Sequence, residues 1–272
     1  YTEITGSQAF TPQYDANGNM VKDDAYTYRY DYNNKLIQVD DRTAIYLYDA
    51  LGRRIRKTTA EGTVNFFYAG DDVIEEQDGA KASLATYLVG NGIDDLIKMN
   101  RNGSDYFYYT NHLGSVMAIT DRSGEIVERY EYDPFGKVSF YNGSGTALMK
   151  SAIGNEVLFT GRSYNAESGL YDYRARAMNP NIGRFVQVDP LLYVDGMNAL
   201  GYVNNNSVGF VDPWGYKSSG CDFNSQPIIK APSGPIMTSG DKPIDYRQPD
   251  PKSNFCIEHP YICGIQGEGH GE

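Results

Sequence analysis

Residue types that often carry chemistry are scarce in this 272-residue chain, which has 3 Cys, 3 His and 1 Trp. The cysteines, Cys221, Cys256 and Cys263, all follow residue 220, so the long first part has no thiol nucleophile or thiolate ligand. Such a region suits an exported protein, and the odd count leaves a spare thiol if one pair closes. No apolar run reaches about 18 residues, so we expect no membrane-spanning helix.

The start of the chain lacks the basic segment and apolar stretch of a secretory signal. Residue 1 falls directly into repeat-like sequence. We therefore expect the chain to be a piece of a longer protein.

Basic residues are also in deficit, because 24 Lys and Arg stand against 35 Asp and Glu, a formal net charge of −11. Nucleic acids and anionic membranes bind clustered Lys and Arg, so neither is expected as the main partner. Tyrosine and glycine are abundant instead, with 24 Tyr and 29 Gly. Tyrosine fits half-buried strand faces and glycine supplies tight turns, so the composition predicts an all-β fold.

A short unit recurs along the chain: a strand ends in Tyr-Asp, a turn carries Gly or Asn, and a second strand leaves through apolar positions. Each Tyr-Asp aspartate is interpreted as a turn residue that caps its own backbone. A lone hairpin is marginal, so successive units must pair edge to edge into a long sheet. The clearest copies are Tyr14-Asp15-Ala16-Asn17-Gly18, Tyr30-Asp31-Tyr32-Asn33-Asn34 and Tyr48-Asp49-Ala50-Leu51-Gly52, with looser ones at residues 121–127 and 132–138.

One copy, Tyr46-Leu47-Tyr48-Asp49-Ala50-Leu51-Gly52-Arg53-Arg54-Ile55, resembles the YD repeat of the Rhs family almost position by position. Residues 111–116 and 129–136 resemble the last units of that family, and residues 159–176 resemble the start of its core-associated domain. The resemblance implies a spiral antiparallel sheet that forms a hollow shell, plugged by the core domain, with the C-terminal segment inside. The repeats here are too few to enclose a cavity, so we expect a curved, open sheet with exposed edges.

The predicted organisation has four parts: YD repeats over 1–138, a connecting loop over 139–156, the core domain with a cleavage motif over 157–216, and a variable, irregular tail over 217–272. The loop prediction rests on several glycines and little periodicity between residues 139 and 156.

Two Asp-Pro dipeptides, at Asp189 and Asp212, lie 23 residues apart, with Gly183-Arg184-Phe185 ahead of the first. Two carboxylates brought close share a proton, because both cannot ionise cheaply. One can then act as base on a water while the other polarises a peptide carbonyl. The opposing interpretation is structural, since Asp-Pro is a common turn dipeptide and Asp133-Pro134 is a third copy inside the repeats.

The Rhs resemblance favours catalysis. In Rhs core domains, and in the similar C components of Tc toxins, a pair of Asp-Pro aspartates carries out self-cleavage. Carried over, Asp189 and Asp212 are the catalytic pair, Arg184 orients or charge-balances them or forms a structural ion pair, and the cut falls between Tyr216 and Lys217. The chain would be an aspartic peptidase that acts only in cis, with no metal or other cofactor.

Three positions depart from the family pattern. Leu192 replaces the usual Gly of the first motif, Ser207 replaces a Pro, and Tyr216 stands where Leu or Met is usual. Each departure would slow cleavage or mark a degenerate copy.

The tail contains 7 of the 12 prolines and no clear period, which favours extended, weakly ordered chain. In the Rhs family this segment is variable and is often a toxin domain released after cleavage. Cys256, His259 and Cys263 lie near one another, but the Cys-x6-Cys spacing is poor for zinc. A disulfide or free thiols are therefore favoured over a metal site.

Three hypotheses follow. In the first, the chain is the C-terminal part of an Rhs polymorphic toxin, which encapsulates a C-terminal payload and releases it by cleavage after Tyr216. The second is a non-catalytic YD-repeat scaffold or cell-surface interaction protein, and the third keeps the shell but makes the tail inert. The first implies upstream repeats as a partner, the C-terminal segment as cargo, a secretion apparatus and an immunity protein, and a secreted or surface location in bacteria.

Overall fold

The computed structural model describes residues 10–193 and 196–220. Every described residue belongs to one compact unit. The predictions for Cys221, Cys256, His259 and Cys263, and for nearly all of the tail, therefore lie outside the described residues.

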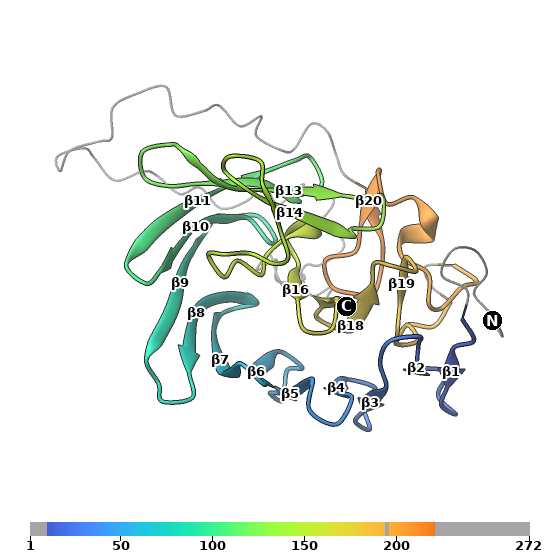
Figure 1. Cartoon of the computed structure of the whole chain (residues 1–272). Helices are drawn as coiled ribbons and strands as arrows, with labels where there is room; N and C mark the ends of the chain where they lie inside the picture. Colours follow the sequence, from blue (N-terminus) through green and yellow to red (C-terminus); the bar gives the residue numbers. More distant parts are fainter. Residues whose placement is uncertain (1–9, 194–195, 221–272) are drawn as a thin grey trace, which may run out of the picture. The chain divides into compact units, whose positions relative to one another are not determined.

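A single 13-stranded antiparallel sheet accounts for most of this unit. Its strands follow one another in chain order, so each pairs with its neighbour in sequence, and β3 and β15 form the two open ends. The sheet curves but does not close (Figure 1), which confirms the predicted all-β, open architecture. The strands are β3 (Tyr28–Tyr30), β4 (Leu36–Val39), β5 (Ala44–Tyr48), β6 (Arg54–Thr59), β7 (Gly62–Ala69), β8 (Asp72–Asp78), β9 (Ser83–Val89), β10 (Leu96–Arg101), β11 (Ser104–Thr110), β12 (Val116–Thr120), β13 (Ile126–Tyr132), β14 (Val138–Asn142) and β15 (Ala147–Leu148).

One turn design joins many of these strands. At Asp49, the Oδ1 atom accepts the N–H of Leu51 and of Arg53, both at 2.9 Å, and Gly52 closes the turn with a φ of +78°. The predicted turn role of the Tyr-Asp aspartates is therefore confirmed. The same pair of contacts, to the second and fourth following residues, recurs at Asp15, Asp31, Asp78, Asn111, Asp121 and Asp133.

The loop predicted for residues 139–156 needs correction. Most of β14 and all of β15 fall within this range and pair as a hairpin. Its turn starts at Asn142 and includes Gly145, with a φ of +86°. Two of the glycines that suggested a loop therefore lie in a hairpin turn at residues 143–146, and residues 149–156 are the longer stretch without helix or strand.

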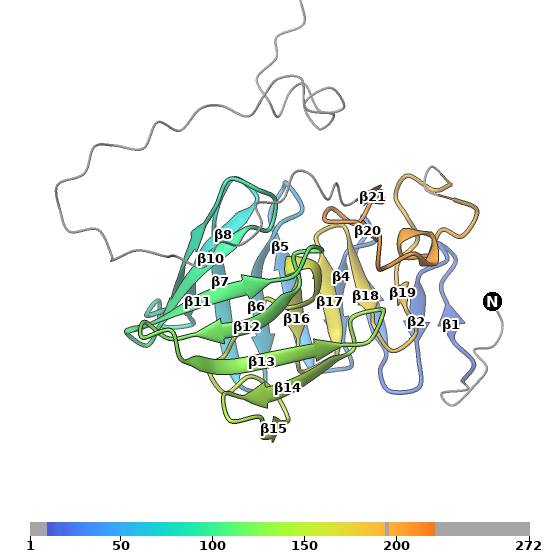
Figure 2. The same cartoon turned by 90° about the horizontal axis from the view of Figure 1, so that it is seen from above.

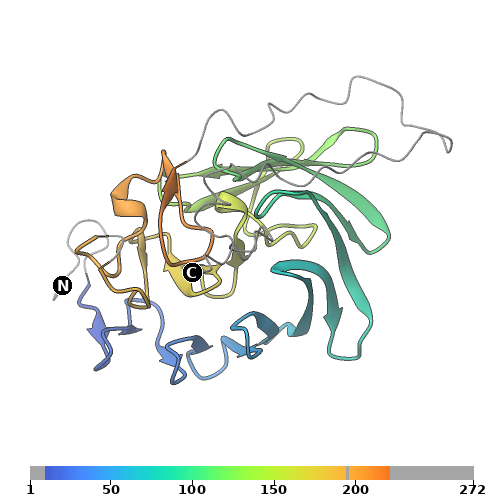
Figure 3. The ribbon, with the colours of Figure 1, turned by 180° about the vertical axis from the view of Figure 1, so that it is seen from behind.

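A smaller antiparallel sheet lies on the concave side of the long one, visible from both sides in Figures 1 and 3. Within the described ranges no helix has the length and apolar character needed to cross a membrane. The smaller sheet comprises β16 (Ser163–Asn165), β17 (Leu170–Tyr173), β18 (Arg176–Asn179) and β19 (Arg184–Phe185), while β1 (Gln13–Tyr14) pairs with β2 (Met20–Lys22), β20 (Phe210–Val211) pairs with β21 (Ser219–Gly220), and the short 3-10 segments are η1 (Phe159–Gly161) and η2 (Val203–Asn205).

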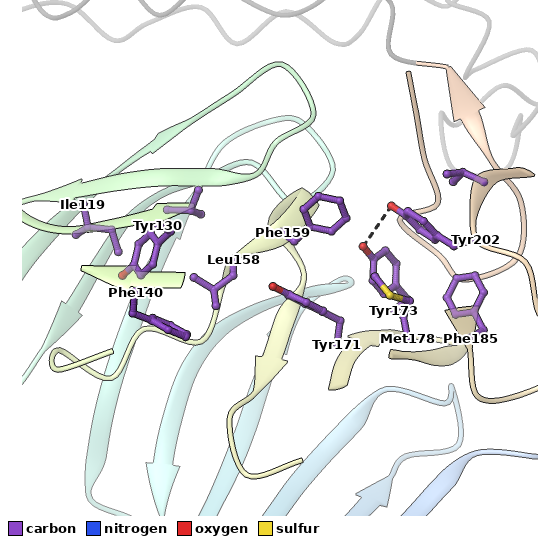
Figure 4. Close-up of a cluster of buried hydrophobic side chains, with 12 residues drawn as sticks. Ile119, Tyr130, Phe140, Leu158, Phe159, Tyr171, Tyr173, Met178, Phe185 and Tyr202 are labelled. Atoms are coloured by element: carbon purple, nitrogen blue, oxygen red, sulfur yellow. Dashed lines mark hydrogen bonds between the residues drawn. The ribbon is translucent and has the colours of Figure 1, made fainter. Parts of the chain in front are cut away.

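Two hydrophobic clusters fix the small sheet inside the curve of the large one. The first joins side chains of β12–β14 to one face of the core segment, residues 157–216 (Figure 4). The second joins β2–β5 to the opposite face of the small sheet, because its members Leu170 and Ala177 alternate along β17 and β18 with members of the first. Figure 2 shows the small sheet lying between the strands that supply these side chains. The predicted plug arrangement is thus the observed one. Members of the first cluster include Ile119, Tyr130, Phe140, Leu158, Phe159, Tyr171, Tyr173, Phe185 and Tyr202, and members of the second include Tyr28, Tyr46, Leu170, Ala177 and Val186.

Candidate functional site

The two predicted aspartates meet at one guanidinium. Asp189, four residues beyond β19, is 3% exposed, and Asp212, directly after β20, is 1% exposed. Arg176, the first residue of β18, places Nη2 3.0 Å from Oδ2 of Asp189 and 3.0 Å from Oδ2 of Asp212. Residues far apart in sequence therefore form a buried ion cluster. The hypothesis that Asp189 and Asp212 act as a pair requires such a cluster.

Arg176 is itself rigidly held. Its Nε donates to the carbonyl of Gly215 at 2.6 Å, and its Nη1 donates to the carbonyl of Ala199 at 3.3 Å. The guanidinium carbon lies 3.7 Å from the ring centroid of Phe185, in cation–π range. Since the side chain is only 3% exposed, its charge acts on the two carboxylates with little screening by water.

Asp212 touches both sides of the predicted cleavage point. Its Oδ1 accepts the N–H of Tyr216 at 3.0 Å and the N–H of Lys217 at 3.1 Å. Gly215 closes this turn with a φ of +69°. The catalytic candidate is thus in contact with the nitrogen that cleavage would release.

Asp189 forms a similar turn despite its missing glycine. Its Oδ1 accepts the N–H of Leu191 at 2.7 Å, and its carbonyl accepts the N–H of Leu192 at 2.9 Å. Leu192 adopts a φ of +59°, the left-handed conformation that glycine would take without penalty. The substitution keeps the turn at a cost of about 1–2 kcal/mol in backbone strain.

Asp133 provides an internal comparison. It forms the same turn, with Oδ1 accepting the N–H of Phe135 and of Lys137. However, its side chain is exposed. The turn interpretation is therefore right for the backbone at Asp133, Asp189 and Asp212. Burial against a shared arginine is what separates Asp189 and Asp212 from Asp133.

Three consecutive backbone carbonyls just before the predicted cleavage site accept hydrogen bonds from the small sheet. The carbonyls of residues 213, 214 and 215 accept, in that order, from Arg174 Nη1 (2.6 Å), the Ala175 N–H (3.2 Å) and Arg176 Nε (2.6 Å). Three consecutive residues at the β17–β18 turn thus hold three consecutive carbonyls. This contact sets the register of the segment against the small sheet.

Burial raises the pKa of Asp212, although Arg176 and the backbone N–H groups of Tyr216 and Lys217 pull it down. The cluster carries two carboxyl groups and one guanidinium, so a proton on one carboxyl would balance the charge. The raised pKa of Asp212 is in the direction that favours its protonated form.

Sequence reasoning missed Arg176, although the residue closes the 159–176 segment that resembles the Rhs core domain. Arg184, the arginine predicted for the site, lies in β19, is half-buried, and pairs through its backbone with Asn179 and Gly201. Its orienting role stays a prediction. No cluster of three metal-ligating side chains is found in the described part of the chain.

Fold and site together define a YD-repeat shell with a core-domain plug. The model of the Teneurin YD-shell family matches residues 3–211, and the chain belongs to that family. It is also related to toxin proteins.

The tRNA3(Ser)-specific nuclease WapA of Bacillus spizizenii is 36% identical over 179 residues, which are 64% of this chain and 7% of that protein. Double-stranded DNA deaminase toxin A of Burkholderia cenocepacia is 27% identical over 65% of this chain and 12% of the relative. The chain thus spans about a tenth of the length of these relatives. The Tc holotoxin pore of Photorhabdus luminescens shares the fold, with a TM-score of 0.59 and 22% identity over 76% of this chain and 11% of that one.

Proposed function

We propose that this chain is the C-terminal part of an Rhs-type toxin that holds its C-terminal segment as cargo and cuts itself between Tyr216 and Lys217. One observation carries the proposal: two buried aspartates share Arg176, and one of them contacts the N–H groups on both sides of that bond. Because the related proteins are named as a nuclease and a deaminase toxin, we further propose that the released segment acts inside a target cell and that the toxin is secreted.

In the proposed reaction, a water attacks the carbonyl carbon of Tyr216 while ionised Asp189 takes one of its protons. Protonated Asp212 then donates its proton to the nitrogen of Lys217 as the C–N bond breaks. The immediate products are a carboxylic acid at Tyr216, which then ionises, and an amine at Lys217, with Asp189 left protonated and Asp212 left ionised. The raised pKa of Asp212 and its 3.1 Å contact with that nitrogen support this division of roles.

Arg176 serves the same reaction in two ways. It stabilises whichever carboxylate is ionised, and it ties the pair to the carbonyl of Gly215, one residue before the cut. Holding the scissile bond next to the acid and the base lowers the entropic part of the activation barrier, because the reacting groups are already in position.

The competing function is a non-catalytic scaffold. It is favoured by the turn that Asp189 and Asp212 share with the exposed Asp133, which needs no chemistry to explain it. The scaffold does not require the two turns to be buried against one arginine, so the cleaving function is the better account.

An intact-mass spectrum of the purified chain distinguishes the two. Self-cleavage predicts fragments 1–216 and 217–272, with Lys217 as a new amino terminus in N-terminal sequencing. The scaffold predicts a single mass. A chain that stays whole after long incubation at several pH values contradicts the proposed activity.

Gly215→Ala should slow cleavage strongly, roughly 100-fold, because misplacing a reacting group by about 1 Å has an effect of that size. Gly215 has a φ of +69°, and an added Cβ would lie 2.4 Å from the carbonyl oxygen of Tyr173. Gly124→Ala is the matched control, since Gly124 has a φ of +85° with nothing within 4 Å of the added Cβ. Both variants carry backbone strain, so equal cleavage rates on a gel time course would contradict the prediction.

A further inference from the structure

Asp94 lies outside the repeat pattern and outside the cleavage cluster. It sits between β9 and β10 with a φ of +57°. Its Oδ1 pairs with Nη1 of Arg162 at 2.6 Å and with Nη2 of Arg174 at 2.9 Å, and its Oδ2 accepts from Nη1 of Arg174 at 3.2 Å. The side chain is 11% exposed, so one mostly buried shell carboxylate pairs with two arginines of the core segment.

Arg174 carries this contact to the cleavage segment. Besides Asp94, its guanidinium donates to the carbonyl of Pro213 and lies 4.4 Å from the ring centroid of Trp214. A continuous chain of contacts therefore runs from the β9–β10 turn to the residues just before Tyr216.

The electrostatics favour the contact between Asp94 and Arg174. Burial lowers the pKa of Arg174 and the charge of Arg162 lowers it further, while Asp94 and, more weakly, Asp71 act in the opposite direction. Without Asp94, two guanidinium groups would repel one another at a mostly buried site. Arg174 would then be driven towards solvent and away from Pro213 and Trp214.

The shell turn also approaches the core segment closely in its backbone. A Cβ added at Gly161 would lie 2.8 Å from the Cβ of Asp94 and 3.0 Å from its carbonyl oxygen. Asp94 therefore reaches its position only when the β9–β10 turn packs directly against the backbone of the core segment at Gly161.

We propose that Asp94 is a positioning residue for self-cleavage, holding Arg174 on Pro213 and Trp214 so that the bond is cut only when the β9–β10 turn is seated. The inference rests on the proposed function. It adds a coupling between folding and cleavage: the bond is cut only after the shell wall has formed. The C-terminal segment is therefore not released before the shell encloses it.

The test follows cleavage of the full chain in a cell-free translation, with a labelled pulse and a chase read on a gel. Asp94→Asn should slow cleavage roughly 10- to 100-fold. Asp94→Glu should recover part of the rate, because it restores the carboxylate. The matched control is Glu76→Gln, which breaks a buried ion pair with Arg101 in the same wall without touching the cleavage segment, and it should cleave at the wild-type rate.

Two further variants separate positioning from loss of fold. If Asp94 acts through Arg174, the Asp94→Asn/Arg174→Gln double variant should cleave no more slowly than Arg174→Gln alone. Asp94→Asn/Arg162→Gln removes the guanidinium that repels Arg174 when Asp94 is lost, so it should cleave faster than Asp94→Asn alone even though it lacks two buried ion-pair partners. Wild-type cleavage by Asp94→Asn, or additive slowing in the first double variant, overturns the inference. A wild-type chain that never cleaves overturns the proposed function itself.

Discussion

Asp212→Asn and Asp189→Asn should each leave the chain as a single band where the wild type gives two. General acid–base catalysis by one positioned group contributes about 10²–10⁴ in rate. Asparagine retains an oxygen that can accept the turn hydrogen bonds, so the backbone around the site should survive. The expected result is therefore a loss of at least about 100-fold in cleavage rate in a folded protein.

The matched control for this experiment lies in the same chain. Asp133→Asn changes the same residue type in the same Asp-Pro turn, but at an exposed position. It should cleave at the wild-type rate. If Asp133→Asn slows cleavage as much as Asp212→Asn does, the slowing comes from a less stable turn and not from the loss of a catalytic group. That result would support the scaffold hypothesis.

The repeats could be predicted from sequence because their turn is a local device. Asp49 satisfies the N–H groups of Leu51 and Arg53 with its own side chain, and Gly52 supplies the left-handed residue, all within five positions. All of the interactions that define the repeat turn are therefore between residues that lie close together in the sequence. Edge-to-edge pairing then follows, because each hairpin leaves an open edge for the next.

The site could be predicted only in part, because its defining contacts are not local. The spacing of Asp189 and Asp212 pointed to a pair, but nothing in sequence shows which arginine a folded sheet places between them. Arg176 and Arg184 are both arginines on neighbouring strands of the small sheet. The tight β17–β18 turn selects Arg176 by bringing it against the carbonyl of Gly215.

The hairpin missed at β14–β15 has a related cause. Its turn starts with Asn142 instead of the expected aspartate, and β15 is only two residues long. Burial of Phe140 in the first hydrophobic cluster stabilises the hairpin, and that cluster is assembled from segments distant in sequence. Short strands whose stability comes from distant packing leave little periodic signal.

Arg176→Gln should abolish cleavage and make the stability of the chain depend strongly on pH. Removing one partner of a buried ion cluster typically costs about 3–5 kcal/mol, because the remaining charges stay buried. Here two carboxyl groups would remain, at 3% and 1% exposure, without the cation that lies 3.0 Å from each. Their folded-state pKa values should therefore rise above the unfolded values of about 3.9.

The direction of the pH effect follows from that rise. An acid whose folded pKa is raised contributes its full stability below the unfolded pKa, and that stability is lost as pH rises through the folded pKa. Arg176→Gln should thus unfold at a higher urea concentration at about pH 4.5 than at about pH 7.5. Arg176→Lys is the matched comparison, because it keeps the charge, and so should show a flatter pH profile. It should still cleave slowly, since a lysine cannot contact both carboxylates and the carbonyl of Gly215 in the planar fork of an arginine. Equal pH profiles for the two variants would mean that Asp189 and Asp212 do not depend on the charge of Arg176, and the proposed electrostatic role would be wrong.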